Sequence, residues 1–342
     1  MRRILSAALA ALCTLGPITS APAAAESAPL KECGGVNLFD ALPPDEQAAL
    51  SARAESAPFA TGNFWQAERD GQEMTIIGTY HLADSRHDAV VTAAEPLIRD
   101  AAALLVEAGP DEEKALKTAM TEDPSLIFIT EGPSLLERLP AETWERLSAA
   151  METRGIPPFM AAKFQPWYAM SVLSLSPCEM PSAGTPRGLD SALIGTATEA
   201  GIPIRALEPY DTVFSIFGAM TPDQETDMIE STLLMEGRSG DFTVTLADLY
   251  FRGESRVIWE LTREVSYDLP GATPEQVDAE MAMMEDAMMN RRNRAWIPVI
   301  DAAAAEGTGP LVVAFGALHL SGEEGVLNLL AQEGWTLTPL EF

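Results

Sequence analysis

Two of the three histidines in this chain stand three residues after a glycine, at the end of a short apolar run. The first is His81, in TIIGTYHLADSRHD (75–88), and the second is His319, in LVVAFGALHLSGEEG (311–325). Imidazole nitrogens bind divalent metals and transfer protons near neutral pH. The repeated Gly-x-x-His spacing therefore indicates that both residues have a function. His87, on the following helix turn, is expected to be exposed to solvent instead.

Two glutamates stand at the ends of other apolar runs. Glu107 closes the run 103–107, and Glu208 follows the run 204–207. If these runs are parallel strands, their carboxyl ends meet at one edge of the sheet, where ligands bind in open α/β folds. One cleft would then collect both glutamates and both histidines. For either glutamate alone, a helix cap or an ion pair with an arginine is an equally good explanation.

Such a set of imidazoles and carboxylates suits a borderline divalent ion, namely Mn²⁺, Co²⁺ or Zn²⁺. The predicted ligands are His81, His319, Glu107 and Glu208. A bound ion lowers the pKa of a water molecule that it coordinates to about 7 and polarises a carbonyl, which makes hydrolysis feasible. A glutamate that is not a ligand would then act as the base. The chain has no His-Glu-x-x-His, Gly-x-Ser-x-Gly, Walker or Gly-x-Gly-x-x-Gly motif, so no organic cofactor is predicted.

Arg292 is a further candidate for the site. It lies in EMAMMEDAMMNRRNRAWIPVI (280–300), where apolar side chains occupy every fourth position before and after it. Its guanidinium is therefore expected on the buried side of a helix, where it needs a carboxylate or an anionic ligand. Pairing with Glu107 or Glu208 and a direct role with the substrate both remain open.

The elements that would position these residues indicate an α/β protein. Strands are predicted at 75–80, 103–107, 204–207 and 311–315, and helical stretches between them favour a mostly parallel sheet that is covered on both faces. Ser85 and Ser321 are predicted to begin capping boxes after the two histidine motifs. The repeated order of strand, motif and helix suggests two related halves. No strand is expected within about 212–300, which is assigned as a helical insertion.

The first 25 residues have the pattern of a secretory signal peptide. Arg2 and Arg3 precede an apolar run, and small residues follow it up to Ala25. Cleavage there would leave a single domain of residues 26–342 with no integral membrane segment, in the periplasm or secreted. The remaining cysteines, Cys33 and Cys178, are predicted to form a disulfide, with two buried thiols as the alternative. A net charge of −29 argues against nucleic acid as a partner.

The order of these motifs resembles the TraB/GumN family, which is related to the Tiki metalloproteases and includes pheromone-shutdown proteins. The resemblance extends over residues 33–342 and includes KFQPWYAM (163–170), GLD (188–190), IPIRALEP (202–209) and RRNRAW (291–296). It implies a fold of the erythromycin-esterase and ChaN-like kind. It also implies a site of His81, Glu107, Glu208 and His319 with Arg292 beside it. Asp190 is expected to cap the helix from Ser191, although the family pattern favours a part in the site.

We therefore expect a metal-dependent hydrolase, namely a peptidase that acts on peptides or protein segments, with Glu107, Glu208 and Arg292 as catalytic candidates. One alternative is a non-catalytic envelope protein that binds a peptide or assists polysaccharide export. Another is an esterase-like hydrolase that uses histidine and glutamate without a metal. The sequence gives no indication of the substrate's identity or of the oligomeric state.

Overall fold

The computed structural model describes residues 34–180, 188–218, 220–269 and 273–341. Its centre is a six-stranded sheet in the order β4-β3-β5-β2-β1-β6. The four strands from β4 to β2 run parallel to one another, and β1 is antiparallel to both of its neighbours. The α/β class with a mostly parallel sheet is therefore confirmed.

All four predicted strands are present, and each agrees with its predicted range to within a few residues. They are β2 (Gln72–Thr79), β3 (Ala103–Val106), β4 (Ile204–Ala206) and β5 (Leu311–Gly316). Every residue of β3 and β5 is buried, which explains why both strands are continuous apolar runs in the sequence. Two further strands, β1 (Phe64–Arg69) and β6 (Thr336–Pro339), were not expected.

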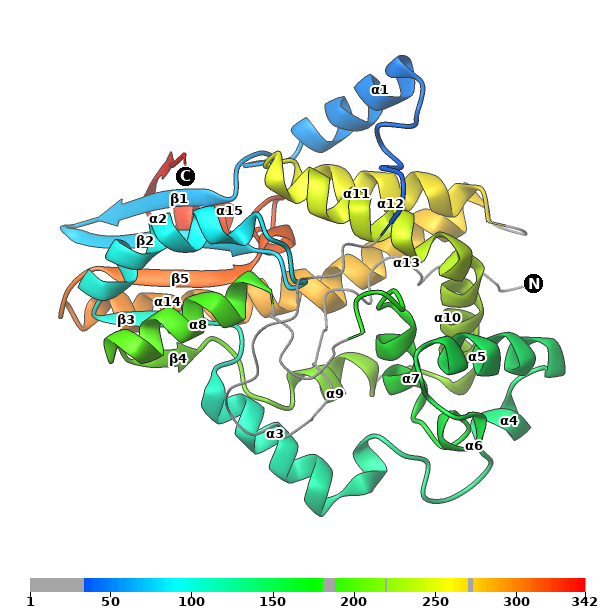
Figure 1. Cartoon of the computed structure of the whole chain (residues 1–342). Helices are drawn as coiled ribbons and strands as arrows, with labels where there is room; N and C mark the ends of the chain where they lie inside the picture. The colour runs from blue at the N-terminus through cyan, green and yellow to red at the C-terminus, as the bar shows by residue number, and fades with distance from the viewer. Residues whose placement is uncertain (1–33, 181–187, 219, 270–272, 342) are drawn as a thin grey trace.

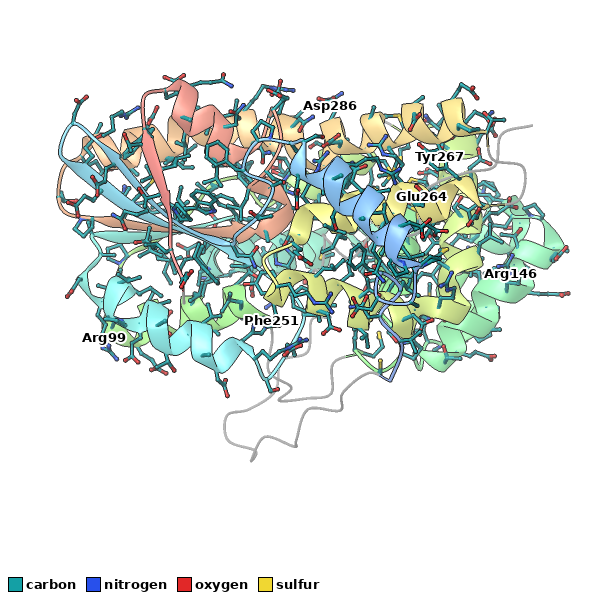
Figure 2. All side chains as sticks on the ribbon, turned by 90° about the horizontal axis from the view of Figure 1, so that it is seen from above. Arg99, Arg146, Phe251, Glu264, Tyr267 and Asp286 are labelled. Atoms are coloured by element: carbon teal, nitrogen blue, oxygen red, sulfur yellow. The ribbon has the colours of Figure 1, made fainter. Side chains whose placement is uncertain are left out.

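Helices cover both faces of the sheet, and Figures 1 and 2 show the resulting three layers. On one face lie α2 (His87–Asp100) and α8 (Leu189–Ala200), which pack against each other. On the other lie α14 (Arg291–Ala305) and α15 (Val326–Gln332). Side chains from the sheet and from all four helices form one apolar core. The burial of each such side chain contributes about 1.5–3 kcal/mol to the stability of the fold. The sheet is therefore a rigid support for the loops that follow its strands.

A second, helical part lies beside the carboxyl ends of the parallel strands (Figure 1). As predicted, residues 212–300 contribute no strand within their described portion. The helical part is larger than expected, however, because a second segment that follows β3 also belongs to it. Its helices are α3 (Pro110–Glu122), α4 (Leu135–Arg138), α5 (Ala141–Thr153), α6 (Pro158–Ala161), α7 (Pro166–Leu173), α9 (Thr212–Phe217), α10 (Pro222–Met235), α11 (Ser239–Phe251), α12 (Ser255–Tyr267) and α13 (Pro274–Glu285). The N-terminal α1 (Pro44–Glu55) packs on α12.

Both predicted capping boxes are wrong. Helix α2 begins only at His87 after Arg86, and α15 begins at Val326 after Gly325; neither preceding residue caps its helix with a side chain. Ser321 instead lies in the turn after the second histidine motif, with its hydroxyl buried. The predicted signal peptide and Cys33 lie outside the described residues, so the cleavage site and the disulfide remain predictions. Among the described helices, none combines the length and the apolar character that crossing a membrane requires.

Candidate functional site

The predicted site residues come together at the carboxyl ends of the four parallel strands. Thr79 of β2 is in register with Gly316 of β5, and Val106 of β3 is in register with Ala314 of β5 and Ala206 of β4. The residues that follow these strands are therefore delivered to one edge of the sheet. They include all four of the predicted ligands, His81, Glu107, Glu208 and His319.

The guanidinium of Arg292 lies at the centre of this group and uses all five of its N–H donors. Its Nε and Nη2 donate to the two oxygens of Glu208 at 2.8 and 2.9 Å, and Nη2 also donates to Glu107 Oε2 at 2.5 Å. Its Nη1 donates to the carbonyl of Met288 at 3.0 Å and lies 3.1 Å from Nε2 of His319. A guanidinium has no further donor to offer a ligand. Of the two roles left open by the sequence, the geometry favours carboxylate pairing for Arg292.

A π-helical turn, Asp286–Asn290, joins α13 to α14 and ends two residues before Arg292. Met288, whose carbonyl accepts from the guanidinium, belongs to this turn. Such turns in long helices are frequent at functional sites because they change the direction of the side chains that follow. Trp296, one helical turn further on, donates from its indole to Glu208 Oε2 at 3.0 Å, so α14 fixes Glu208 from two positions.

Glu107 is held by donors on both of its oxygens. Its Oε2 accepts from Arg292, and its Oε1 accepts from the backbone N–H of Gly316 at 2.7 Å. Burial raises the pKa of this carboxyl, but the charges of Arg292 and its other neighbours outweigh burial and lower the pKa to about 2. For Glu208, by contrast, burial and the charge of Glu107 raise the pKa above its ordinary value, against the opposing effect of Arg292. Glu107 is therefore the carboxylate that stays ionised longest on acidification.

His81 is bound to Asp190, on the first turn of α8. Its Nδ1 lies 2.7 Å from Asp190 Oδ2, and the hydroxyl of Thr79 donates to Asp190 Oδ1 at 2.6 Å. Burial lowers the pKa of His81, yet the charge and hydrogen bond of Asp190, with the charge of Glu107, raise it to about 9. Because an ionised carboxylate only accepts, Nδ1 carries a proton and Nε2 is left facing Glu107 Oε1 at 3.9 Å.

His319 has different surroundings. Its Nδ1 lies 2.5 Å from Asn293 Oδ1, while Asn293 Nδ2 donates to the carbonyl of Glu324 at 2.8 Å. That second bond fixes the direction of the amide, so Asn293 accepts the Nδ1 proton and His319 Nε2 becomes an acceptor for Arg292. The ring also stacks at 4.5 Å on Trp296. Burial and the charge of Arg292 lower the pKa of His319 to about 3, so the ring is neutral at physiological pH.

The glycines of the two motifs provide room, and neither has a left-handed backbone. A Cβ atom on Gly316 would stand 2.9 Å from His81 Nε2 and 3.3 Å from Glu107 Oε1. A Cβ atom on Gly78 would stand 2.5 Å from the side chain of Leu320, directly after the other motif. Gly316 thus makes space for His81 of the first motif, and Gly78 makes space for Leu320, which follows the second motif.

Two of the four predicted metal ligands, His81 and Glu107, each have one donor atom that makes no hydrogen bond to Arg292. His81 Nε2 and Glu107 Oε1 face each other across Gly316, whereas both Glu208 oxygens and His319 Nε2 accept from Arg292 or Trp296. No cluster of three potential ligands with metal-binding geometry occurs among the described residues. With Arg292 in this position, the donor set therefore fits an ion at His81 and Glu107 only, and it does not fit the four-ligand shell.

The comparisons with known proteins agree with the motifs. The model of the TraB/PrgY/gumN family matches residues 63–339. The chain belongs to the TraB/PrgY/gumN family. It is also similar to the uncharacterized protein YbaP of Escherichia coli (strain K12) and of Shigella flexneri, with 23% identity over 260 residues in each case. These alignments cover 75% of this chain and 86% of each relative. No solved structure shows a significant match.

Within this TraB/PrgY/gumN chain, three contacts were not anticipated. Asp190 was expected to cap a helix, but its carboxylate holds His81, and α8 instead begins at Leu189 after Gly188. Asn293 was not recognised as a partner of His319. His87 is buried beside Tyr80 and bonds to the carbonyl of Leu82 at 2.9 Å, so the expectation that it is exposed is wrong. The GLD motif was the available signal for Asp190, and the RRNRAW motif was the signal for Asn293.

Proposed function

We propose that this TraB/PrgY/gumN protein is a hydrolase that cleaves an amide or ester bond in peptides or protein segments, with His81 as its proton-transferring residue. The observation that carries the proposal is the pair formed by His81 and Asp190, 2.7 Å apart, with His81 Nε2 directed toward Glu107. A partly buried carboxylate on Nδ1 selects the tautomer with a basic Nε2 and stabilises the imidazolium that forms on protonation.

The opening between His81 Nε2 and Glu107 Oε1 suits a small nucleophile. The two atoms are 3.9 Å apart, so a water molecule at a hydrogen-bond distance of about 2.8 Å from each can contact both. In the proposed reaction, neutral His81 takes a proton from this water as the water attacks the substrate carbonyl. The imidazolium, stabilised by Asp190, then gives the proton to the leaving nitrogen or oxygen.

The remaining residues have positioning roles in this proposal. Arg292 neutralises Glu107 and Glu208 and fixes the direction of Glu107, while the buried neutral His319 accepts from Arg292. A residue that holds another in place contributes by preorganisation, because a displacement of about 1 Å in a catalytic group can lower the rate by about 100-fold. Arg292, Glu208 and His319 therefore support the reaction without contacting the substrate.

Metal-assisted hydrolysis is a second candidate, favoured by the same pair of atoms. His81 Nε2 and Glu107 Oε1 would hold Mn²⁺, Co²⁺ or Zn²⁺, and the glycine at 316 leaves space beside them. Such an ion would supply Lewis-acid activation of water or of the carbonyl. For the location, we propose the periplasm or the exterior of the cell, on the basis of the N-terminal pattern at residues 1–25.

The test is a hydrolysis assay with quenched-fluorescent peptides and chromogenic esters, in chelator and in added Mn²⁺, Co²⁺ or Zn²⁺. Loss of general-base catalysis lowers a rate by about 10²–10⁴-fold, which is the expected effect of His81→Gln. Arg291→Lys is the control, because this side chain is 68% exposed and pairs with Asp286 on the surface. Activity that survives His81→Gln would reject the proposal, and complete absence of hydrolysis would favour the non-catalytic alternative.

A further inference from the structure

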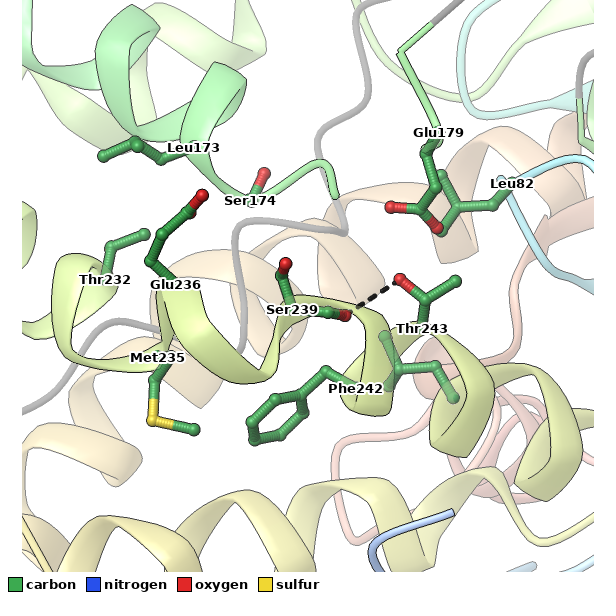
Figure 3. Close-up of a pocket in the computed structure, with 11 residues that line it drawn as sticks. Leu82, Leu173, Ser174, Glu179, Thr232, Met235, Glu236, Ser239, Phe242 and Thr243 are labelled. Atoms are coloured by element: carbon green, nitrogen blue, oxygen red, sulfur yellow. Dashed lines mark hydrogen bonds between the residues drawn. The ribbon is translucent and has the colours of Figure 1, made fainter. Parts of the chain in front are cut away.

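A pocket next to the His81 loop contains a buried carboxylate oxygen without a partner. It is bounded by α7, α10, α11, the loop that carries Leu82, and Glu179, which Figure 3 shows on the same side as Leu82. Oε2 of Glu179 accepts from the N–H of Ser176 at 2.8 Å. Its Oε1 is buried and makes no hydrogen bond to the described residues, although the nearby hydroxyl of Thr243 helps to lower the pKa of this carboxyl.

Four of the other polar side chains that line this pocket already have partners. The two oxygens of Glu236 accept from Arg154 at 2.7 and 2.9 Å. The hydroxyls of Ser174, Thr232 and Thr243 each donate to a backbone carbonyl, and Figure 3 shows this bond for Thr243. Among the described lining residues, Glu179 Oε1 is thus the buried side-chain atom that a ligand would have to satisfy.

The chemistry of the walls defines the ligand further. Apolar side chains line the pocket together with the carboxylate, namely Leu82, Leu173, Met235, Phe242 and Leu246. Burial raises the pKa of Glu179, and the opposing effects of the Ser176 N–H, the Thr243 hydroxyl and the charge of Arg154, which is paired with Glu236, do not outweigh it. A ligand cation would compensate that cost far better than a neutral donor. An aliphatic stem with a cationic end matches both the walls and the carboxylate.

We propose that this pocket is a subsite for a lysine or arginine side chain of a peptide, with Glu179 as the residue that binds the cation. Leu82, which lines the pocket, directly follows His81, so a side chain bound there belongs to a segment that passes the candidate site. The net charge of −29 also favours encounter with basic peptides. The proposal rests on the proposed peptide hydrolysis for its substrate class, but the pocket binds its ligand independently of turnover.

The experiment measures binding without catalysis. N-acetyl-lysine N-methylamide and its norleucine analogue, which lacks the charge, are titrated into the protein and followed by ligand-observed NMR. We expect the lysine probe to bind at least 10-fold more tightly than the norleucine probe. Glu179→Gln should abolish this difference, while Glu152→Gln, a change on the exposed surface of α5, should preserve it. Circular dichroism establishes that each variant is folded.

Equal affinity of the wild-type protein for the two probes would overturn the proposal whether or not Glu179→Gln folds. An unchanged preference for lysine in folded Glu179→Gln would also overturn it. The two proposals can fail separately. Selective binding of the lysine probe without cleavage of any peptide would support the lysine pocket and contradict the proposed hydrolase. Peptide cleavage without selective binding would support the hydrolase and contradict the lysine pocket.

Discussion

Nδ1 of His81 lies 2.7 Å from the carboxylate of Asp190, 109 residues further along the chain. Asp190→Asn should therefore lower the pKa of His81 below its value of about 9, because the variant removes the charge and the acceptor that stabilise the imidazolium. Titration of the ¹⁵N-labelled histidines by NMR measures this pKa directly. Asp100→Asn, at the exposed end of α2, is the matched control. An unchanged His81 pKa in Asp190→Asn would show that the carboxylate does not stabilise the imidazolium.

The same pair determines the expected pH dependence of hydrolysis. If His81 acts as the base, the neutral ring is the active form, and the rate should rise from pH 7 to about pH 9. In Asp190→Asn the rise should occur at lower pH, together with a lower plateau, because the tautomer and the imidazolium are no longer supported. A rate that falls over this range in the wild-type protein would assign His81 the role of an acid instead.

Much of the sheet could be predicted because its inner strands are buried on both faces. The runs that became β3, β5 and most of β2 are apolar and short, whereas β4 is an edge strand with the exposed Arg205 at its centre; each of the four ends where the polar site residues begin. Strand β1 was missed because its residues alternate between buried and more exposed positions in the short sequence FWQAER. A hairpin signal was nevertheless present, since Asp70 and Gly71 form a two-residue turn with positive φ angles of 51° and 82°.

The positions of the site residues could be predicted, but their contacts could not. Strand ends bring His81, Glu107, Glu208 and His319 to one edge, and this follows from the parallel order alone. Which atom faces which depends on helices that are distant in sequence. The contact of Asp190 with His81 requires Gly188 to approach so closely that a Cβ atom would stand 2.1 Å from the His81 carbonyl oxygen. No spacing in the sequence encodes that approach.

Gly316→Ala should impair the site more than the fold. The added methyl would stand 2.9 Å from His81 Nε2 and 3.3 Å from Glu107 Oε1, so it would occupy the opening between the two groups. We expect hydrolysis to fall by at least 10-fold while the protein remains folded. Gly195→Ala is the control, because it lies within α8 with nothing within 4 Å of the new methyl, and it should stabilise the helix by about 1 kcal/mol. Full activity in Gly316→Ala would show that this opening is not the reaction site.

Arg292→Lys should destabilise the protein more than Arg291→Lys or Arg294→Lys. Lysine keeps the charge but cannot replace the planar set of donors that Glu107 and Glu208 share, so buried acceptors would lose their partners. The expected loss is on the order of 3 kcal/mol in urea unfolding. Arg291 and Arg294 are 68% and 47% exposed and should change stability by no more than about 0.5 kcal/mol. Equal losses at all three positions would contradict the central role of Arg292.

The two site histidines should affect stability in opposite pH ranges. The folded pKa of His319 is lowered to about 3, so its contribution is complete above its ordinary value of about 6.5 and is lost as pH falls toward 3. The folded pKa of His81 is raised to about 9, so its contribution is complete below about 6.5 and is lost as pH rises through 9. In His319→Gln, the loss of unfolding free energy between pH 6.5 and 4.5 should therefore become smaller than in the wild type. A wild-type slope in that variant would contradict the assignment.

The last prediction concerns a bound ion and tests which of the two histidine motifs supplies its ligand. If Mn²⁺, Co²⁺ or Zn²⁺ binds, His81→Ala and Glu107→Gln should each remove it, because they supply the donor atoms that are directed away from Arg292. His319→Gln should retain the ion, because His319 Nε2 accepts from Arg292 at 3.1 Å and Nδ1 is held by Asn293. Elemental analysis and calorimetric titration of the folded variants measure the occupancy and the affinity. Loss of the ion in folded His319→Gln would instead mean that Arg292 moves away on binding and that both motifs share one ion. Retention of the ion in His81→Ala would exclude the site between His81 and Glu107.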